Sequence, residues 1–139
     1  MTYPDPKMYI AGTWRSAGSG RTLPVINPAT EEILAQVPLA SETDLDEAVA
    51  AASACGRVWS NTSAFERAAI LRKAAGLLRD RADDIARILT QEQGKPLIEA
   101  RGEVLASADV TDWMADEGRR NYGRIIPARA SRVQQMVIR

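Results

Sequence analysis

The chain has 139 residues, and its 18 Lys and Arg side chains balance 18 Asp and Glu side chains, so its formal net charge is zero. This length suits one domain, and the charge balance argues against sequence-independent binding to nucleic acid. The sequence has no histidine and a single cysteine, which excludes His-dependent nucleophile pairs, the HExxH zinc helix and an internal disulfide.

The chain shows no membrane or export signal. Residues 1–7 lack the apolar core of a signal peptide. No apolar run reaches the roughly 18 residues that indicate a transmembrane helix. We therefore expect a cytoplasmic protein that binds neither membrane nor nucleic acid.

The first 40 residues predict two strand pairs. Ala11-Gly12 separates two short strand-like pieces, and a two-residue connection that contains glycine favours a tight hairpin. Asn27-Pro28-Ala29-Thr30 has the composition of a turn between the second two strands. Residues 16–20 are rich in serine and glycine and are interpreted as a flexible loop. The expected strands are residues 8–10, 13–15, 25–27 and 33–37.

Two capping boxes mark where helices should begin, the first at Ser41 with Asp44 and the second at Ser63 with Glu66. Behind Ser41, apolar residues recur at helical spacing and predict a buried stripe. The charged stretch 79–84 predicts a kink or short break in the second helix. The expected stripe of the first helix is Leu45, Ala48, Val49, Ala52, Cys55 and Trp59.

Gly94 predicts a helix C-terminus, and Pro96 can open a third helix that extends to about Asn121. Ile125-Ile126 and Val133–Ile138 are typical of strands. The last strand reaches the chain end with no following turn and no evident partner. We therefore expect it to present an open edge.

The residues that could carry chemistry are few. Cys55 could be a nucleophile, but no histidine is present to activate it, and a small core residue is the simpler interpretation. Gly18-Ser19-Gly20 lacks the third glycine of a dinucleotide loop, and Gly94-Lys95 lacks the other elements of a phosphate loop. Glu99 and Glu103 lie one turn apart on one helix face. An acid/base or metal role would need further ligands facing them, and a solvated helix face is the simpler interpretation.

The order of several motifs resembles NAD(P)-dependent aldehyde dehydrogenases. Residues 9–14 (YIAGTW) are similar to YINGEW, residues 25–32 to VINPATGE, and residues 92–97 (EQGKPL) to ETGKPL. The helix that contains Asp46–Ala52 is similar to the VDxAVxAA helix. Residues 113–123, followed by Ile126-Pro127-Ala128, look most like succinate-semialdehyde dehydrogenases.

The resemblance implies an α+β fragment of the α/β aldehyde dehydrogenase fold, with N-terminal β-hairpins, then alanine-rich helices, then a terminal strand. It implies that residues 1–123 pack on the cofactor-binding domain and that residues 124–139 begin the oligomerisation strand region. A homo-oligomer formed through Val133–Ile138 is expected. Some family members hold a structural cation, and Ile26 and Glu103 fall near the positions that bind it.

In the family, the nucleophilic cysteine, the general-base glutamate and the nucleotide-binding lysine lie beyond the position of Arg139. We therefore assign no catalytic, cofactor-binding or metal-ligating residue to this chain. The resemblance implies an enzyme that oxidises an aldehyde, succinate semialdehyde, to its acid with NAD or NADP; the chain itself is expected to bind no cofactor and to be inactive alone. The alternative is a non-catalytic helical module for interaction or oligomerisation.

Overall fold

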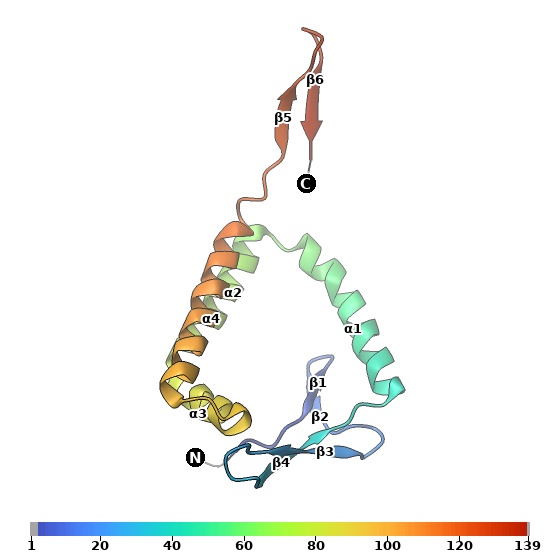
Figure 1. Ribbon diagram of the computed structural model, residues 1–139. Helices are drawn as coiled ribbons and strands as arrows, with labels where there is room; N and C mark the ends of the chain where they lie inside the picture. Colours follow the sequence, from blue (N-terminus) through green and yellow to red (C-terminus); the bar gives the residue numbers. More distant parts are fainter. Residues whose placement is uncertain (1–2, 139) are drawn as a thin grey trace.

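The computed structural model describes residues 3–138, and the chain forms an open ring that carries a projecting arm (Figure 1). The ring consists of two β-hairpins and four helices, and the arm is a third hairpin, residues 124–138. The elements are β1 (Met8–Ile10), β2 (Thr13–Arg15), β3 (Thr22–Ile26), β4 (Ile33–Pro38), α1 (Glu42–Asn61), α2 (Ala64–Asp80), α3 (Ala82–Gln93), α4 (Leu97–Glu117), β5 (Arg124–Pro127) and β6 (Gln134–Val137).

Both N-terminal hairpins are antiparallel, as the turn residues predict. Ala11 and Gly12 both have positive φ, 50° and 82°, which is the backbone of a two-residue hairpin turn. Tyr9 lies opposite Trp14, with ring centroids 4.8 Å apart. In the second hairpin the side chain of Asn27 accepts a hydrogen bond from the Ala29 N–H at 2.9 Å and so stabilises the turn.

The helix boundaries follow local signals. Both predicted capping boxes are confirmed, at Ser41 with Asp44 and at Ser63 with Glu66. The predicted break is also confirmed, because α2 ends at Asp80 and α3 begins at Ala82. α4 ends at Glu117, earlier than the predicted Asn121.

The core of the chain is small and made almost wholly of alanine. It lies where α4 packs on α2 and α3, and each of its members is at most 5% exposed. Alanine lets helix axes approach closely, and ion pairs between the helices flank the contact, such as Arg79 with Asp112 at 2.7 Å and Arg101 with Asp83 at 2.7 Å. The core residues of the three helices are Ala68, Ala75, Ala82, Ala86, Ala100, Val104, Ala108 and Ala115.

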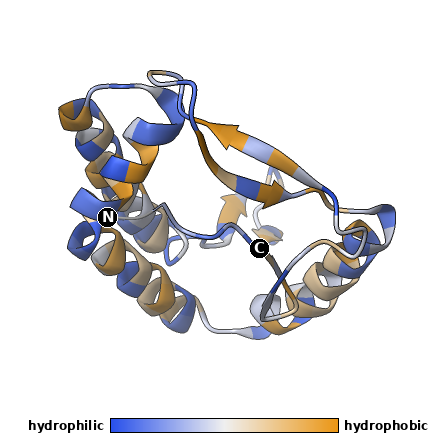
Figure 2. Cartoon of the chain, turned by 90° about the horizontal axis from the view of Figure 1, so that it is seen from below, coloured by the Kyte–Doolittle hydropathy of each residue, from blue (hydrophilic) through white to orange (hydrophobic). Residues whose placement is uncertain are grey.

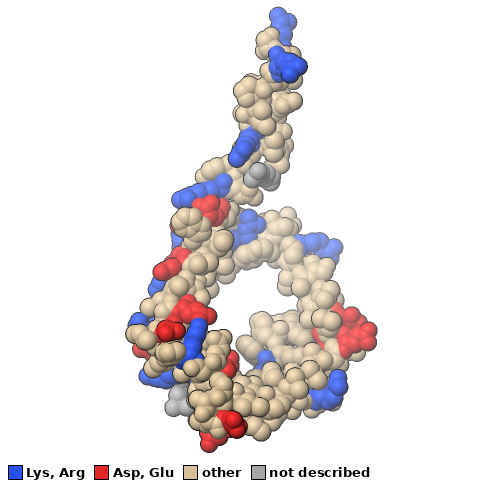
Figure 3. Space-filling view, in the orientation of Figure 1, with Lys and Arg blue, Asp and Glu red and all other residues tan. Residues whose placement is uncertain are grey.

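Two contacts close the ring at the corner between α3 and α4. The β3–β4 turn meets Gly94, where a Cβ added to the glycine would lie 3.0 Å from Pro28 Cγ. The Tyr3 hydroxyl donates to the Glu92 carboxylate, and burial together with this contact raises the pKa of Tyr3 to about 12. The space-filling view shows that an opening remains through the ring (Figure 3).

The prediction of a buried stripe on α1 is wrong. Leu45, Val49 and Trp59 are between 44% and 60% exposed, and Cys55 is exposed as well. The helical period is present, but among residues 3–138 the β1–β2 hairpin faces only part of this stripe, across a hollow, and leaves its large side chains exposed. α1 instead spans the ring opposite α2 and α4 (Figure 1), and its one buried residue is Asp44.

The expectation of an unpartnered final strand is also wrong. β6 pairs with β5 in an antiparallel hairpin that matches Arg124 with Val137 and Pro127 with Gln134. Every residue of both strands is exposed. The predicted order of hairpins, alanine-rich helices and a C-terminal strand is confirmed. None of the described helices has the length and apolar character needed to cross a membrane.

Candidate functional site

The most highly connected polar group in the ring is the carboxylate of Asp44, which is only 4% exposed. It accepts hydrogen bonds from the Ser41 N–H at 2.9 Å, the Ser41 hydroxyl at 2.7 Å and the Gly18 N–H at 3.1 Å. Arg15 Nη2 donates to it at 3.1 Å and also pairs with Glu47. We call these five residues the Asp44 junction.

The junction holds Asp44 in its ionised form. The pKa of Asp44 is lowered, chiefly by the Ser41 backbone N–H and hydroxyl, then by the Gly18 N–H and by the charge of Arg15. These donors outweigh the effect of burial, which acts in the opposite direction. An ionised carboxylate whose oxygens are already hydrogen-bonded is unsuited to donate a proton, so the junction fastens the Ser16–Gly20 loop to α1 instead.

The two glycine motifs have structural roles. The Gly18 N–H donates a hydrogen bond to the Asp44 carboxylate. The negative charge of that carboxylate would repel a phosphate placed at this loop. Gly94 is the left-handed C-cap of α3, with φ 73°. Neither glycine motif therefore forms a phosphate-binding loop in this structure.

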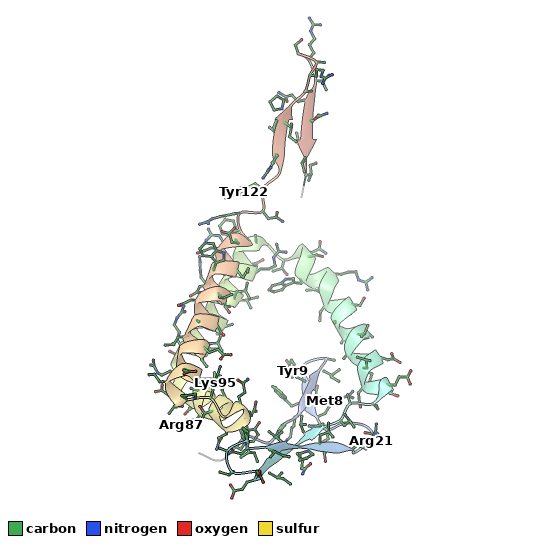
Figure 4. The ribbon with its side chains drawn as sticks, in the orientation of Figure 1. Met8, Tyr9, Arg21, Arg87, Lys95 and Tyr122 are labelled. Atoms are coloured by element: carbon green, nitrogen blue, oxygen red, sulfur yellow. The ribbon has the colours of Figure 1, made fainter. Side chains whose placement is uncertain are left out.

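Glu103 is engaged by the ammonium group of Lys95, which lies at the α3–α4 corner (Figure 4). A cation near Ile26 and Glu103 would have to displace that ammonium. Glu99 is not part of the Lys95–Glu103 ion pair, and it forms no ion pair with any of residues 3–138. In the same part of the chain, no three His, Cys, Asp or Glu side chains are grouped so that they could hold a metal ion.

Cys55 lines a concave surface with a volume of about 550 Å³ between α1 and the β1–β2 hairpin. Figure 4 shows Tyr9 on this hairpin extending into the space that the ring encloses. The surface is lined by alanines of α1 and by residues 9–12, and its lining includes no acidic or basic side chain. The interpretation of Cys55 as a core residue is wrong for this structure, but its surroundings also lack a group that could activate the thiol.

A smaller hollow of about 270 Å³ marks the base of the arm. The Arg119 guanidinium lies 4.6 Å above the Phe65 ring, a cation–π contact between α2 and the end of α4. Tyr122 lies where α4 leads into β5 (Figure 4). Local sequence patterns do not indicate this contact, because Phe65 and Arg119 are far apart in the chain.

The ring leaves many of its large apolar side chains exposed. Hydrophobic residues appear on all four helices and on the hairpins (Figure 2). On α4 the side opposite the alanine core exposes Trp113 at 66% and Ile98 at 79%. Contiguous exposed apolar surface is typical of protein contacts. The exposed side chains of α1 and α4 thus offer an apolar packing surface.

Comparison with known proteins identifies the family. The profile described as "Aldehyde dehydrogenase family" matches residues 14–139. The chain belongs to the aldehyde dehydrogenase family. Among solved structures, an aldehyde dehydrogenase of Brucella melitensis biovar abortus 2308 superposes with a TM-score of 0.92 at 42% identity, over 96% of this chain and 28% of that one.

The curated relatives include several semialdehyde dehydrogenases. Succinate semialdehyde dehydrogenase of Acinetobacter baylyi is 40% identical over 122 residues, which are 88% of this chain and 25% of that protein. Glutarate-semialdehyde dehydrogenase of Pseudomonas putida is 40% identical over 131 residues, which are 94% of this chain and 27% of that protein. The chain thus spans about a quarter of the length of the curated relatives that it matches.

Proposed function

We propose that this chain forms the N-terminal packing part of an aldehyde dehydrogenase subunit and supplies no catalytic group itself. The observation that carries the proposal is the exposed apolar surface of α1 and α4 on a chain that matches about a quarter of each relative. Residues 1–123 would pack on the cofactor-binding domain, and residues 124–139 would begin the oligomerisation region.

The substrate that the relatives support is a short aldehyde that carries a carboxylate. Relatives at about 40% identity are named for succinate semialdehyde and for glutarate semialdehyde. We favour succinate semialdehyde, because the residues around Trp113–Gly123 resemble that group. The cofactor would be NAD or NADP, which accepts a hydride from the aldehyde when bound, and the subunit would work in the cytoplasm.

Self-association is the second part of the proposal. The segment Val133–Ile138 contains β6, which pairs with β5 in a hairpin whose strand residues are all exposed. Neither strand has a second neighbour among residues 3–138. Open edges pair readily with another strand. A homo-oligomer would cover them.

Complementation tests the enzymatic part. The NADP-dependent succinate-semialdehyde dehydrogenase of Escherichia coli is 39% identical to this chain over 130 residues. Its remainder, without the region that matches this chain, is co-expressed with residues 1–139 and assayed for NADPH at 340 nm. The chain alone and the remainder alone should show no turnover, whereas the two together should. The matching region of the E. coli protein is the positive control.

The complementation result distinguishes a packing part of an enzyme subunit from a non-catalytic interaction module. Turnover with the E. coli region but none with this chain would contradict the proposal and favour the alternative of a non-catalytic interaction module. Turnover by the purified chain alone would contradict the statement that it supplies no catalytic group.

A further inference from the structure

A hollow on the side of the ring formed by the β3–β4 hairpin has no part in the functions described above. It has a volume of about 330 Å³ and lies between the N-terminal segment, the loop before β3, and β3 and β4 themselves. Its lining includes no residue of α1, α4 or the arm, so packing through those elements does not by itself fill it. We call it the Arg21 hollow. Its polar groups come from Asp5, Ser16, Arg21, Thr22 and Gln36.

Three side chains of the Arg21 hollow have hydrogen-bond donors without a partner in residues 3–138. The guanidinium group of Arg21, which lies at the start of β3 (Figure 4), forms no ion pair and no hydrogen bond there. The hydroxyl of Ser16 is also unbonded in that part of the chain. Gln36 Oε1 accepts from the Thr22 hydroxyl at 3.1 Å, which leaves the side-chain N–H groups of Gln36 free. A few polar groups that line one hollow are typical of a small-molecule site.

The loop that carries Arg21 is held in place before any ligand binds. The Arg21 N–H donates to Ser19 Oγ at 3.3 Å, and the Arg21 carbonyl accepts from the Leu39 N–H at 2.9 Å. The Gly18 N–H fastens the same loop to Asp44. Because the backbone under the free donors is already ordered, a ligand has less conformational entropy to remove when it binds.

The charges of the Arg21 hollow favour a ligand with one negative charge. Arg21 and Asp5 are the charged residues of its lining, and Asp5 pairs with Lys7 at 3.4 Å. The charge of Arg21 is therefore the one that a ligand can compensate. A second negative charge on the ligand would be repelled by Asp5. The planar guanidinium group also matches the two oxygens of a carboxylate.

We propose that the Arg21 hollow binds a small monocarboxylate that carries a hydroxyl group. The carboxylate pairs with the guanidinium group of Arg21, and the ligand hydroxyl accepts a hydrogen bond from the side-chain amide of Gln36. The volume of about 330 Å³ is at the small end of ligand pockets, which span roughly 300–1,000 Å³, and so suits a short acid. This inference goes beyond the proposed function and does not rest on it, so failure of the complementation assay would leave it standing.

A titration of the ¹⁵N-labelled 139-residue chain with sodium lactate tests the inference, with ¹H–¹⁵N correlation spectra recorded at constant ionic strength. The backbone signals of residues 16–22 and the side-chain amide of Gln36 should shift and saturate, with a Kd on the order of 1–10 mM. Propionate has the same charge but no hydroxyl, and it should bind more weakly than lactate. Succinate and inorganic phosphate, which carry more negative charge, should bind more weakly still.

Three variants assign the binding to the named side chains. Arg21→Gln removes the charge and should weaken lactate binding by about tenfold or more. The matched control, Arg57→Gln, removes an exposed cation of α1 and should bind lactate like the wild-type chain. Asp5→Asn removes the charge that repels a dianion, so it should strengthen phosphate binding more than lactate binding.

The same spectra show whether each variant is folded, because a folded chain keeps its dispersed signals outside the Arg21 hollow. The absence of saturable shifts at lactate concentrations well above the expected Kd would overturn the proposal. So would shifts confined to residues outside the hollow, an Arg21→Gln variant that binds like the wild type, or an equal loss in Arg57→Gln. Phosphate that binds the wild-type chain as tightly as lactate would contradict the selectivity for a monocarboxylate.

Discussion

Replacement of Gly94 by alanine tests how the ring is closed. Gly94 ends α3 with φ 73° and donates its N–H to the Thr90 carbonyl at 2.8 Å. A residue with a Cβ loses about 1–2 kcal/mol in this left-handed conformation. The added Cβ would also lie 3.0 Å from Pro28 Cγ. The pyrrolidine ring of Pro28 must therefore move away from the new methyl group.

Gly20 supplies a matched control for the backbone part of this cost. Its φ is 66°, close to that of Gly94, but nothing lies within 4 Å of its added Cβ. We therefore expect Gly20→Ala to lower the free energy of unfolding by about 1 kcal/mol and Gly94→Ala by about 2 kcal/mol. The difference reports the contact with Pro28.

Urea unfolding followed by circular dichroism at 222 nm measures these costs. The double variant Pro28→Ala/Gly94→Ala should recover the contact part, so the two substitutions should be non-additive by more than about 0.5 kcal/mol. If Gly94→Ala and Gly20→Ala cost the same, and Pro28→Ala is additive with Gly94→Ala, then the β3–β4 turn does not press on the α3–α4 corner and the reasoning is refuted.

Four other outcomes are expected. Ser41→Ala removes the N-cap of α1 and should cost about 1 kcal/mol in urea unfolding; Thr43→Ala, on the same helix, should cost less. Because the pKa of Asp44 is lowered in the folded chain from its ordinary 3.8, its stabilising effect is complete above that value and is lost as the pH falls below it; Asp44→Asn should flatten this acid limb of a pH–stability curve. Cys55, which is exposed, should react with a thiol reagent in the native chain as fast as in urea. Gly102 is an exposed position inside α4 with nothing within 4 Å, so Gly102→Ala should raise the free energy of unfolding by about 0.5–1 kcal/mol.

The sequence was sufficient wherever the signal is local. The caps at Ser41 and Ser63 each need only a hydroxyl and an acid three residues later. The C-cap at Gly94 needs only a residue that tolerates positive φ. Such features depend on the conformation of a few neighbouring residues, so they are the same in any tertiary context.

Contacts between distant segments could not be predicted in this way. Asp44 was recognised as a capping residue, but nothing in the sequence indicates that Arg15 and Gly18 would also donate to it. The contact of Phe65 with Arg119 is equally invisible. The partner of β6 was missed because the connection, residues 128–133, is longer than the two-residue turns that mark a hairpin most clearly.

The exposed stripe of α1 shows what hydrophobic periodicity reports. The spacing of Leu45, Val49 and Trp59 correctly gives a helix with one apolar face, but spacing carries no information about which segment covers that face. Within residues 3–138 the β1–β2 hairpin faces only part of it and leaves the large side chains exposed, and Trp113 on the outer side of α4 is exposed as well. The alanine core holds α2, α3 and α4 together without these larger side chains. The large apolar residues are therefore available to a partner, and the mismatch between predicted and observed burial locates the surface through which this chain would act.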